Sequence, residues 1–269
     1  GCNLACKYCQ NWEISTSRQF ETLAAPATPR ALAAAAADVG AAGVAFTYND
    51  PIVFAEYAID TAVACHEAGL LAVAVSAGWI SPEPCKELFG AVDAANIDLK
   101  GFTDDFYRRV TGGRLNDVLD TLVRVRELGT WLEITTLLIP GRNDSDDEIA
   151  AECAWIVSEL GAEVPVHFSA FHPAHRMLDI PRTPASTLER ARAIARDAGI
   201  AHVYLGNVRT RDGAATRCAG CGDLLVDRAG YRVVDYRITP DGACPHCARP
   251  VPGIWDPAGP PPPTGQWWP

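Results

Sequence analysis

The stretch that decides the fold is Gly1-Cys-Asn-Leu-Ala-Cys-Lys-Tyr-Cys-Gln-Asn-Trp12. It holds three cysteines, Cys2, Cys6 and Cys9, at C-x3-C-x2-C spacing, with Tyr8 directly before the third. Three neighbouring thiolates suit a four-iron cluster, because each can bind one iron and leave the fourth iron open to another ligand. A structural zinc site is less suitable, because it needs four ligands and no fourth lies nearby. A disulfide would leave one cysteine over.

Length and composition indicate one large folded domain with an appendage. The chain has 269 residues, of which 48% are hydrophobic, and this excludes wholesale disorder. Its net charge of −10 argues against a general nucleic-acid binder and against an anionic-membrane binder. No apolar run approaches the length of a membrane span. Because the chain starts at Gly1 and its only methionine is Met177, we expect it to be a fragment or a processed chain.

The ten cysteines are distributed in a way that fits a reducing, cytoplasmic location. Seven of them fall into two clusters with metal-ligand spacing, which is unlike a disulfide framework. The other three, Cys65, Cys85 and Cys153, share helical patterns with apolar residues. We therefore expect these three to be buried and to act as small hydrophobic residues.

Strand-like and helix-like segments alternate along most of the chain. Strands are expected at 43–48, 71–75, 94–99, 131–139, 164–169 and 201–205, the first of them buried. Helices are expected at 29–40, with Thr28 as N-cap, at 52–67, from 82, and at 103–112, 115–128, 146–160 and 184–198. Residues 13–27 have no clear pattern and are expected to be irregular. Such alternation predicts βαβ units and a parallel sheet, so the fold class is α/β. Six strands suit an open, partial β/α barrel better than a closed eight-stranded one.

Polar residues recur just past the ends of the expected strands. In a parallel sheet these positions meet at one edge, where active sites of barrel folds lie. Each residue alone is more often a helix cap or a loop residue, so their recurrence is what predicts a site. They are Asn49, Asp50, Ser76, Asp98, Lys100, Thr135, Thr136, His167, Ser169, His172 and Asn207.

The character of the sequence changes near residue 210. Cys218 with Cys221 and Cys244 with Cys247 form two C-x2-C pairs, and the segment between them alternates like a β-hairpin. Four such thiolates predict a small zinc-ribbon-like lobe held by structural zinc. An auxiliary iron–sulfur cluster is the alternative, and His246 inside the second pair is not expected to be a ligand. We therefore divide the chain into a β/α domain (1–209), a four-cysteine lobe (210–255) and a Pro-rich flexible tail (256–269).

The segments read so far resemble one family, the radical S-adenosylmethionine (SAM) enzyme of the AmmeMemoRadiSam system, which is related to pyruvate formate-lyase activating enzymes. The resemblance implies a partial β/α barrel of the radical SAM type, and it covers nearly the whole chain, including the cysteine ribbon. The segments that look like successive motifs of this family are 1–15, 46–51, 96–102, 134–141, 167–169 with 171–173, and 204–207.

The resemblance also implies a mechanism and its cofactors. A [4Fe–4S] cluster on Cys2, Cys6 and Cys9 would bind SAM and cleave it reductively to a 5′-deoxyadenosyl radical, which abstracts hydrogen from a substrate that the sequence does not name. The side chains that would contact SAM are Tyr8 beside the adenine, Asn49 and Asp50 near the amino group, Asp98 and Lys100 near the carboxylate and ribose, and His172 near the adenosine. Ser76 is also expected to bind the cofactor. A strand that precedes the cysteine loop in the family is expected upstream of Gly1.

Partners and alternatives follow from the same resemblance. An electron donor such as flavodoxin or ferredoxin is expected, together with proteins of the Memo and AMME-candidate-region types, and neither nucleic acid nor a membrane. A glycyl-radical-enzyme activase is the alternative enzyme. A non-catalytic iron–sulfur or zinc assembly module is the alternative from another class of protein.

Overall fold

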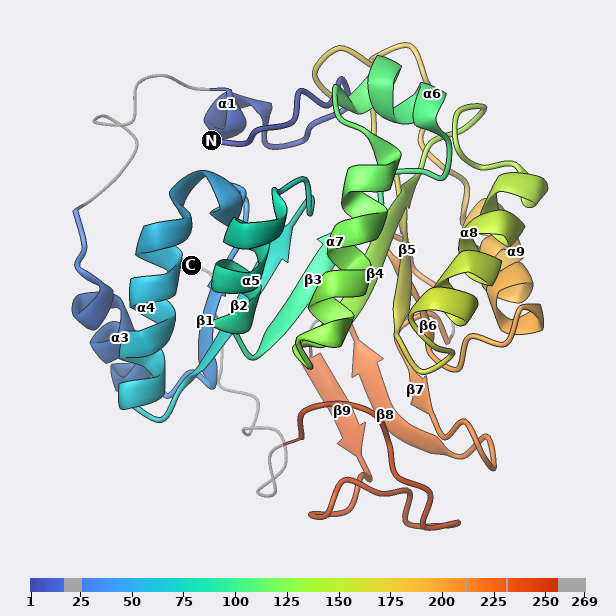
Figure 1. Cartoon of the computed structure of the whole chain (residues 1–269). Helices are drawn as coiled ribbons and strands as arrows, with labels where there is room; N and C mark the ends of the chain where they lie inside the picture. The colour runs from blue at the N-terminus through green and yellow to red at the C-terminus, as the bar shows by residue number, and fades with distance from the viewer. Residues whose placement is uncertain (17–25, 211, 231, 256–269) are drawn as a thin grey trace.

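The computed structural model describes residues 1–16, 26–210, 212–230 and 232–255, so the expected flexible tail at 256–269 lies outside the described residues. A six-stranded parallel sheet is covered by helices, and a three-stranded antiparallel sheet lies at one of its ends (Figure 1). The large sheet has the sequential order β1-β2-β3-β4-β5-β6. Because β1 and β6 are its two edges, the sheet forms an open barrel, and the α/β fold predicted from the sequence is confirmed.

The strands of the two sheets keep close to the predicted positions. Those of the parallel sheet are β1 (Gly43–Phe46), β2 (Leu71–Ser76), β3 (Ala94–Asp98), β4 (Trp131–Leu138), β5 (Val166–Ala170) and β6 (Val203–Gly206). Those of the antiparallel sheet are β7 (Thr216–Arg217), β8 (Leu224–Ala229) and β9 (Arg232–Tyr236), and they form the expected C-terminal lobe.

Helices lie between successive strands of the parallel sheet, as βαβ units require, and α1 and α3 precede β1. They are α1 (Trp12–Ser15), α3 (Pro29–Asp38), η1 (Pro51–Phe54), α4 (Ala55–Glu67), α5 (Pro82–Gly90), α6 (Asp104–Phe106), η2 (Tyr107–Thr111), α7 (Leu115–Glu127), α8 (Asp146–Glu159) and α9 (Ala185–Asp197). Across the described ranges, no helix combines the length and the apolar character that crossing a bilayer requires.

The sequence predictions fail in three places. β1 is not a buried strand, because it is an edge of the sheet and only Phe46 is buried. α1 makes one helical turn that covers 13–15 of the segment expected to be irregular, and a single turn is too short to show a periodic pattern. Residues 17–25 of that segment lie outside the described residues. The helix expected at 103–112 divides into α6 and a π-helical turn, η2, in which the N–H of Gly112 donates to the carbonyl oxygen of Tyr107.

The two faces of the sheet have different environments. On β4, Leu132, Ile134, Thr136 and Leu138 are buried toward the helices, whereas the alternating residues are half-buried and face the inside of the open barrel. This alternation decides which polar side chains can reach a ligand inside the barrel.

One carboxylate is buried on the helix-covered face of the sheet. Glu152 of α8 is 2% exposed and accepts a hydrogen bond from Oγ1 of Thr136 (2.5 Å). Burial raises the pKa of Glu152 to about 8, since the charged form loses its hydration. The folded protein therefore keeps a proton on Glu152 that the unfolded chain releases at neutral pH.

This carboxyl is expected to make stability fall as pH rises. Between pH 6 and pH 8 the folded state holds more protons than the unfolded state, so the free energy of unfolding should fall by about 2 kcal/mol through this group. Glu152→Gln should remove that part of the slope, whereas Glu159→Gln, at an exposed position of the same helix, should keep it. Urea unfolding of the protein at several pH values measures the slope. An unchanged slope in the Glu152 variant would contradict the assignment.

Candidate active site

A cavity of about 290 Å³ lies at the carboxyl ends of the parallel strands, against the N-terminal loop. Two backbone hydrogen bonds fix this loop to η2. The N–H of Ala5 donates to the carbonyl oxygen of Thr111 (2.8 Å), and the N–H of Lys7 donates to that of Val110 (2.9 Å). The three cysteines of the loop all line the cavity.

These three thiols fit an iron–sulfur cluster better than a single ion. The pKa of Cys6 is raised to about 11, chiefly by burial and also by the neighbouring thiols Cys2 and Cys9, although Lys100 opposes the rise. Three thiolates this close repel one another unless a cation neutralises them. In the part of the chain that the structure describes, only the four C-terminal cysteines have all ligand atoms within 4.8 Å of one another. The wider spacing of the loop thiols suits a cluster of several irons, with one thiolate on each iron.

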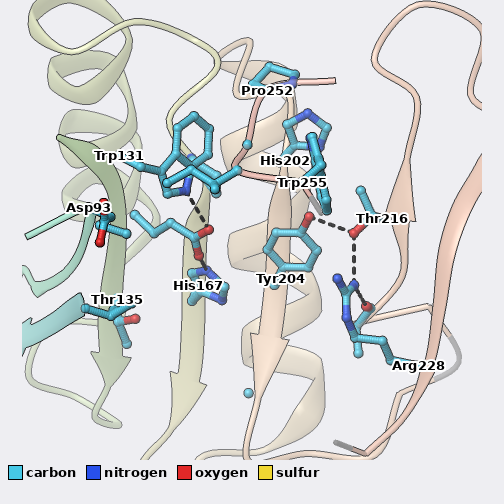
Figure 2. A pocket seen from close by; sticks show the side chains of 18 of the residues that line it. Asp93, Trp131, Thr135, His167, His202, Tyr204, Thr216, Arg228, Pro252 and Trp255 are labelled. Atoms are coloured by element: carbon cyan, nitrogen blue, oxygen red, sulfur yellow. Dashed lines mark hydrogen bonds and ion pairs between the residues drawn. The ribbon is translucent and has the colours of Figure 1, made fainter. Parts of the chain in front are cut away.

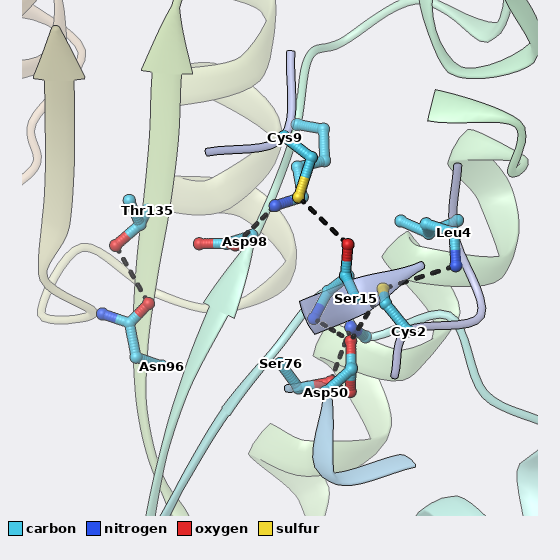
Figure 3. A network of polar contacts seen from close by, with 12 residues as sticks. Cys2, Leu4, Cys9, Ser15, Asp50, Ser76, Asn96, Asp98 and Thr135 are labelled. Carbon is cyan, nitrogen blue, oxygen red and sulfur yellow. Dashed lines mark hydrogen bonds and ion pairs between the residues drawn. The ribbon is translucent and has the colours of Figure 1, made fainter. Parts of the chain in front are cut away.

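Asp50 joins the loop to the end of β2 (Figure 3). Its Oδ1 accepts hydrogen bonds from Oγ of Ser76 (2.9 Å) and the N–H of Ile52 (3.2 Å), and its Oδ2 accepts one from the N–H of Ala77 (2.9 Å). The thiol of Cys2 lies 4.0 Å from Oδ2. Burial raises the pKa of Asp50, and these hydrogen bonds oppose that rise. Asp50 thus braces the cavity wall, and most of its acceptor capacity is used inside the protein.

Lys100 and Asp98 form a charged pair on the opposite wall. Nζ of Lys100 lies 2.5 Å from Oδ2 of Asp98, and both side chains are largely buried. Burial alone would lower the pKa of Lys100, but Asp98 and nearby Tyr8 outweigh it and hold this pKa well above the ordinary value. The lysine is therefore cationic and faces the same cavity as the thiols.

Tyr8 presents an unused hydroxyl to the site. Its side chain is 4% exposed, it lines the cavity, and its hydroxyl has no hydrogen-bond partner among the described residues. Burial raises the pKa of Tyr8 well above its ordinary value, so the phenol is neutral. A buried hydroxyl without a partner is unfavourable, and a ligand in the cavity could supply one.

Most of the site residues expected from the sequence come together here. The following predicted residues line this one cavity: Cys2, Cys6, Cys9, Tyr8, Asn49, Asp50, Ser76, Asp98, Lys100, Thr135, Ser169 and Asn207. His172 is half-buried and does not line it. The sequence analysis missed Ser15, whose Oγ lies 3.5 Å from the thiol of Cys9. It also missed the backbone N–H of Ala77, which contacts Asp50 and carries no side-chain signal.

Two of the polar residues expected at this edge lie elsewhere. Thr136 points to the opposite face of the sheet, toward Glu152, because neighbouring residues of a strand alternate between faces. His167 is on the inner face of β5, two residues before Ser169 and further from the carboxyl end of the strand. It lines a second cavity.

The four C-terminal cysteines converge as predicted. Sγ of Cys218 lies 3.5 Å from Sγ of Cys247, and Sγ of Cys221 lies 3.7 Å from Sγ of Cys244. Zn–S bonds of about 2.3 Å in a tetrahedron place the sulfurs about 3.8 Å apart, which these distances match. The donor set and its size fit one tetrahedral ion, and His246 is exposed outside the converging group.

The sequence matches the family model of the radical SAM superfamily over residues 1–153, which contain the three loop cysteines and the Asp98–Lys100 pair. The chain belongs to the radical SAM superfamily. Membership implies a [4Fe–4S] cluster and SAM as cofactors and SAM cleavage as the general reaction. The three thiols in one cavity fit this cluster, because they leave one iron open for SAM.

Similar proteins support the assignment. The chain is 41% identical over 228 residues to the uncharacterized protein MJ0808 of Methanocaldococcus jannaschii, which covers 85% of this chain and 68% of that protein. It is 27% identical over 151 residues to the pyruvate formate-lyase-activating enzyme of Clostridium pasteurianum, covering 55% of this chain and 63% of the relative. The radical SAM chain is therefore homologous to glycyl-radical-enzyme activases, and it spans less than two thirds of that activating enzyme's length.

Solved structures share the fold. A domain of a pyruvate formate-lyase-activating enzyme from Bacteroides vulgatus has a TM-score of 0.54 at 18% identity, over 61% of this chain and 99% of that one. SuiB of Streptococcus suis bound to its precursor peptide SuiA has a TM-score of 0.60 at 11% identity, over 77% of this chain and 46% of SuiB. At these identities the likeness concerns the fold alone.

Proposed function

We propose that this radical SAM protein cleaves SAM reductively in the cavity at the carboxyl ends of β1–β6. The observation that carries the proposal is that three half-buried thiols and the Asp98–Lys100 pair line one cavity. Cys2, Cys6 and Cys9 would hold the [4Fe–4S] cluster, which when bound supplies the electron for SAM cleavage. An electron donor such as flavodoxin or ferredoxin would reduce the protein.

The residues of the chain would bind and orient SAM around that cluster. Lys100 offers a cationic ammonium to the SAM carboxylate, and Asp98 holds that ammonium in place while leaving one carboxylate oxygen for a ribose hydroxyl. Tyr8 offers its unused hydroxyl beside the adenine. Asp50 and Ser76 keep the wall near the SAM amino group rigid, with Asn49 next to them.

The reaction is expected to be detectable without the natural substrate. The anaerobically reconstituted protein, given SAM and dithionite, should produce 5′-deoxyadenosine and methionine in equal amounts, because the reductive cleavage splits SAM into these two parts. Omitting dithionite is the control. A protein that carries the full complement of iron and forms no 5′-deoxyadenosine would contradict the proposal and favour a non-catalytic assembly module.

The finer assignment is to the AmmeMemoRadiSam type, supported by the order of the six sequence motifs and by the cysteine ribbon. Proteins of the Memo and AMME-candidate-region types are then expected as substrate or co-catalyst, and affinity purification from the native organism tests this. The activase alternative rests on the homology to activating enzymes. A glycyl radical enzyme among the neighbouring genes would favour it.

The C-terminal cysteines are proposed to hold zinc. The sulfur–sulfur distances fit one tetrahedral ion, whereas a four-iron cluster would need thiolates on separate irons. The residues 1–209 and 210–255 would then be a catalytic barrel and a metal-stabilised lobe.

A further inference from the structure

A second cavity of about 560 Å³ lies on the inner face of the barrel, at the amino ends of the strands. We call it the lower cavity, and we call the cavity beside the cysteine loop the upper cavity. The lower cavity is the larger of these two, and its size is in the range of small-molecule sites, about 300 to 1,000 Å³. Strands β4 to β6 form one side, and the C-terminal lobe with residues 252–255 closes the other (Figure 2). The lobe therefore completes a cavity that the barrel alone would leave open.

Two carboxylates line this cavity, Asp93 and Glu133, and each is already paired with a histidine. Oε1 of Glu133 accepts a hydrogen bond from Nε1–H of Trp131 (3.0 Å), and its Oε2 lies 2.6 Å from Nε2 of His167. Burial would raise the pKa of Glu133, but the hydrogen bond and charge of His167 together with Trp131 and Arg228 lower it below its ordinary value. Glu133 is thus ionised and holds Nε2 of His167 as the proton-bearing nitrogen. Nδ1 of His167 has no partner among the described residues.

Arg228, the arginine that lines this cavity, uses only some of its hydrogen-bond donors. Nη1 of Arg228 donates to Oγ1 of Thr216 (2.9 Å) and to the carbonyl oxygen of Ala214 (2.8 Å), and the guanidinium lies 5.9 Å from the centre of the Tyr204 ring. Arg228 forms no ion pair with any residue that the structure describes. Its Nε and Nη2 remain free to donate, and a planar guanidinium with two free donors suits a carboxylate.

The walls of the cavity are aromatic. The ring of His167 stacks on Tyr204, with centroids 4.9 Å apart, and Trp131 and Trp255 face the same space (Figure 2). His202 also lines the cavity, is 5% exposed, and its Nε2 has no hydrogen-bond partner in the described chain. Burial lowers the pKa of His202, so this imidazole is neutral. A buried unpaired nitrogen in a cavity wall is unfavourable unless a ligand or water satisfies it.

We propose that this lower cavity binds a small organic anion, a carboxylate on a planar apolar body, with Arg228 holding the carboxylate and Trp131, Tyr204 and Trp255 holding the body. Neither carboxylate that lines the cavity forms an ion pair with Arg228, because Glu133 pairs with His167 and Asp93 pairs with His66. The free donors of Arg228 are therefore available to a ligand. Planar aromatic side chains favour a planar partner through stacking.

The position of the cavity indicates that this anion is the substrate. The upper and lower cavities share Thr135 and Ser169 in their walls, so a ligand in the lower one can extend toward the SAM end. This role as substrate rests on the proposed SAM cleavage. It also separates the protein from an activase, whose substrate is another protein.

The test compares two bicyclic probes that differ only in charge, 2-naphthoate and 2-naphthamide. Calorimetric titration of the anaerobic holoprotein, without SAM, should show that naphthoate binds about tenfold or more tightly than naphthamide, as a charge-assisted hydrogen bond predicts. Arg228→Gln should remove this preference while naphthamide binding persists. Arg237→Gln, at an arginine of the lobe that pairs with Asp235 outside the cavity, should keep it.

Equal affinity for the two probes, absence of naphthoate binding, or an unchanged preference in Arg228→Gln would each overturn the proposal. If Arg228→Gln does not fold, the preference of the wild-type protein decides, together with Trp255→Leu, in which the binding of both probes should weaken. Since SAM takes no part in the titration, a negative result here and a failure of SAM cleavage are distinguishable.

Discussion

Replacing Cys6 by alanine is expected to abolish SAM cleavage and to remove most of the bound iron. Cys6 is the middle ligand of the loop and the thiol whose pKa burial raises most clearly, to about 11, so it becomes a thiolate only when iron binds it. Without it, two of four irons would lack a protein ligand. Iron content, the visible absorbance of the cluster and 5′-deoxyadenosine formation should all fall to background after anaerobic reconstitution.

The matched control is Cys85→Ala. Cys85 is fully buried in α5, away from both cavities, so its replacement removes a thiol without touching a proposed ligand. That variant should lose about 1 kcal/mol or somewhat more of stability and keep its iron and its SAM cleavage. Iron content and activity at the wild-type level in Cys6→Ala would refute the cluster assignment.

The order of the elements and the cavity at the carboxyl ends could be predicted from the sequence. Alternating strands and helices dictate a parallel sheet, and a parallel sheet brings the residues after each strand to one edge. Ser76 ends β2 and Asp98 ends β3, while Asp50 and Lys100 follow β1 and β3, so their meeting required only the topology. The two C-x2-C pairs likewise required only the chemistry of tetrahedral metal sites.

What the sequence could not predict depends on contacts between distant residues. Nothing in the local pattern says that Arg228 and Trp255 of the lobe meet Glu133 and His167 of the barrel, since the lobe could dock on either end of the sheet. The position of His167 along the barrel axis depends on the register of β5 with its neighbours, which the hydrogen bonds between these strands set. The bond from the N–H of Ala77 to Asp50 is made by a backbone group that every residue except proline carries.

The C-terminal lobe is expected to depend on its metal for folding. Its buried core consists of Leu225, Val226, Ile238 and Val251 with two of the cysteines, which is too small to be stable alone. Burial raises the pKa of Cys218, but hydrogen bonds from the backbone N–H groups of Cys221 and Gly220 and from the thiols of Cys247 and Cys221 outweigh it and lower this pKa to about 6. This sulfur is therefore ready to bind a cation. Cys244→Ser should therefore reduce bound zinc from one equivalent to near zero and unfold the lobe.

Unfolding of the lobe should disrupt the lower cavity and leave the upper cavity intact. Arg228, Thr216 and Trp255 close the lower cavity, so Cys244→Ser should also lose naphthoate binding, whereas the loop cysteines at the opposite end of the sheet should keep their iron. Hydrogen exchange should rise throughout 216–251 and stay unchanged in β2 to β4.

His246→Ala is the matched control, because His246 lies in the same C-x2-C pair, is exposed and is not one of the converging ligands. Zinc content and exchange should therefore stay at wild-type levels. If Cys244→Ser keeps its zinc, or loses zinc with the lobe still protected from exchange, the metal does not hold this lobe together and the small core must be sufficient.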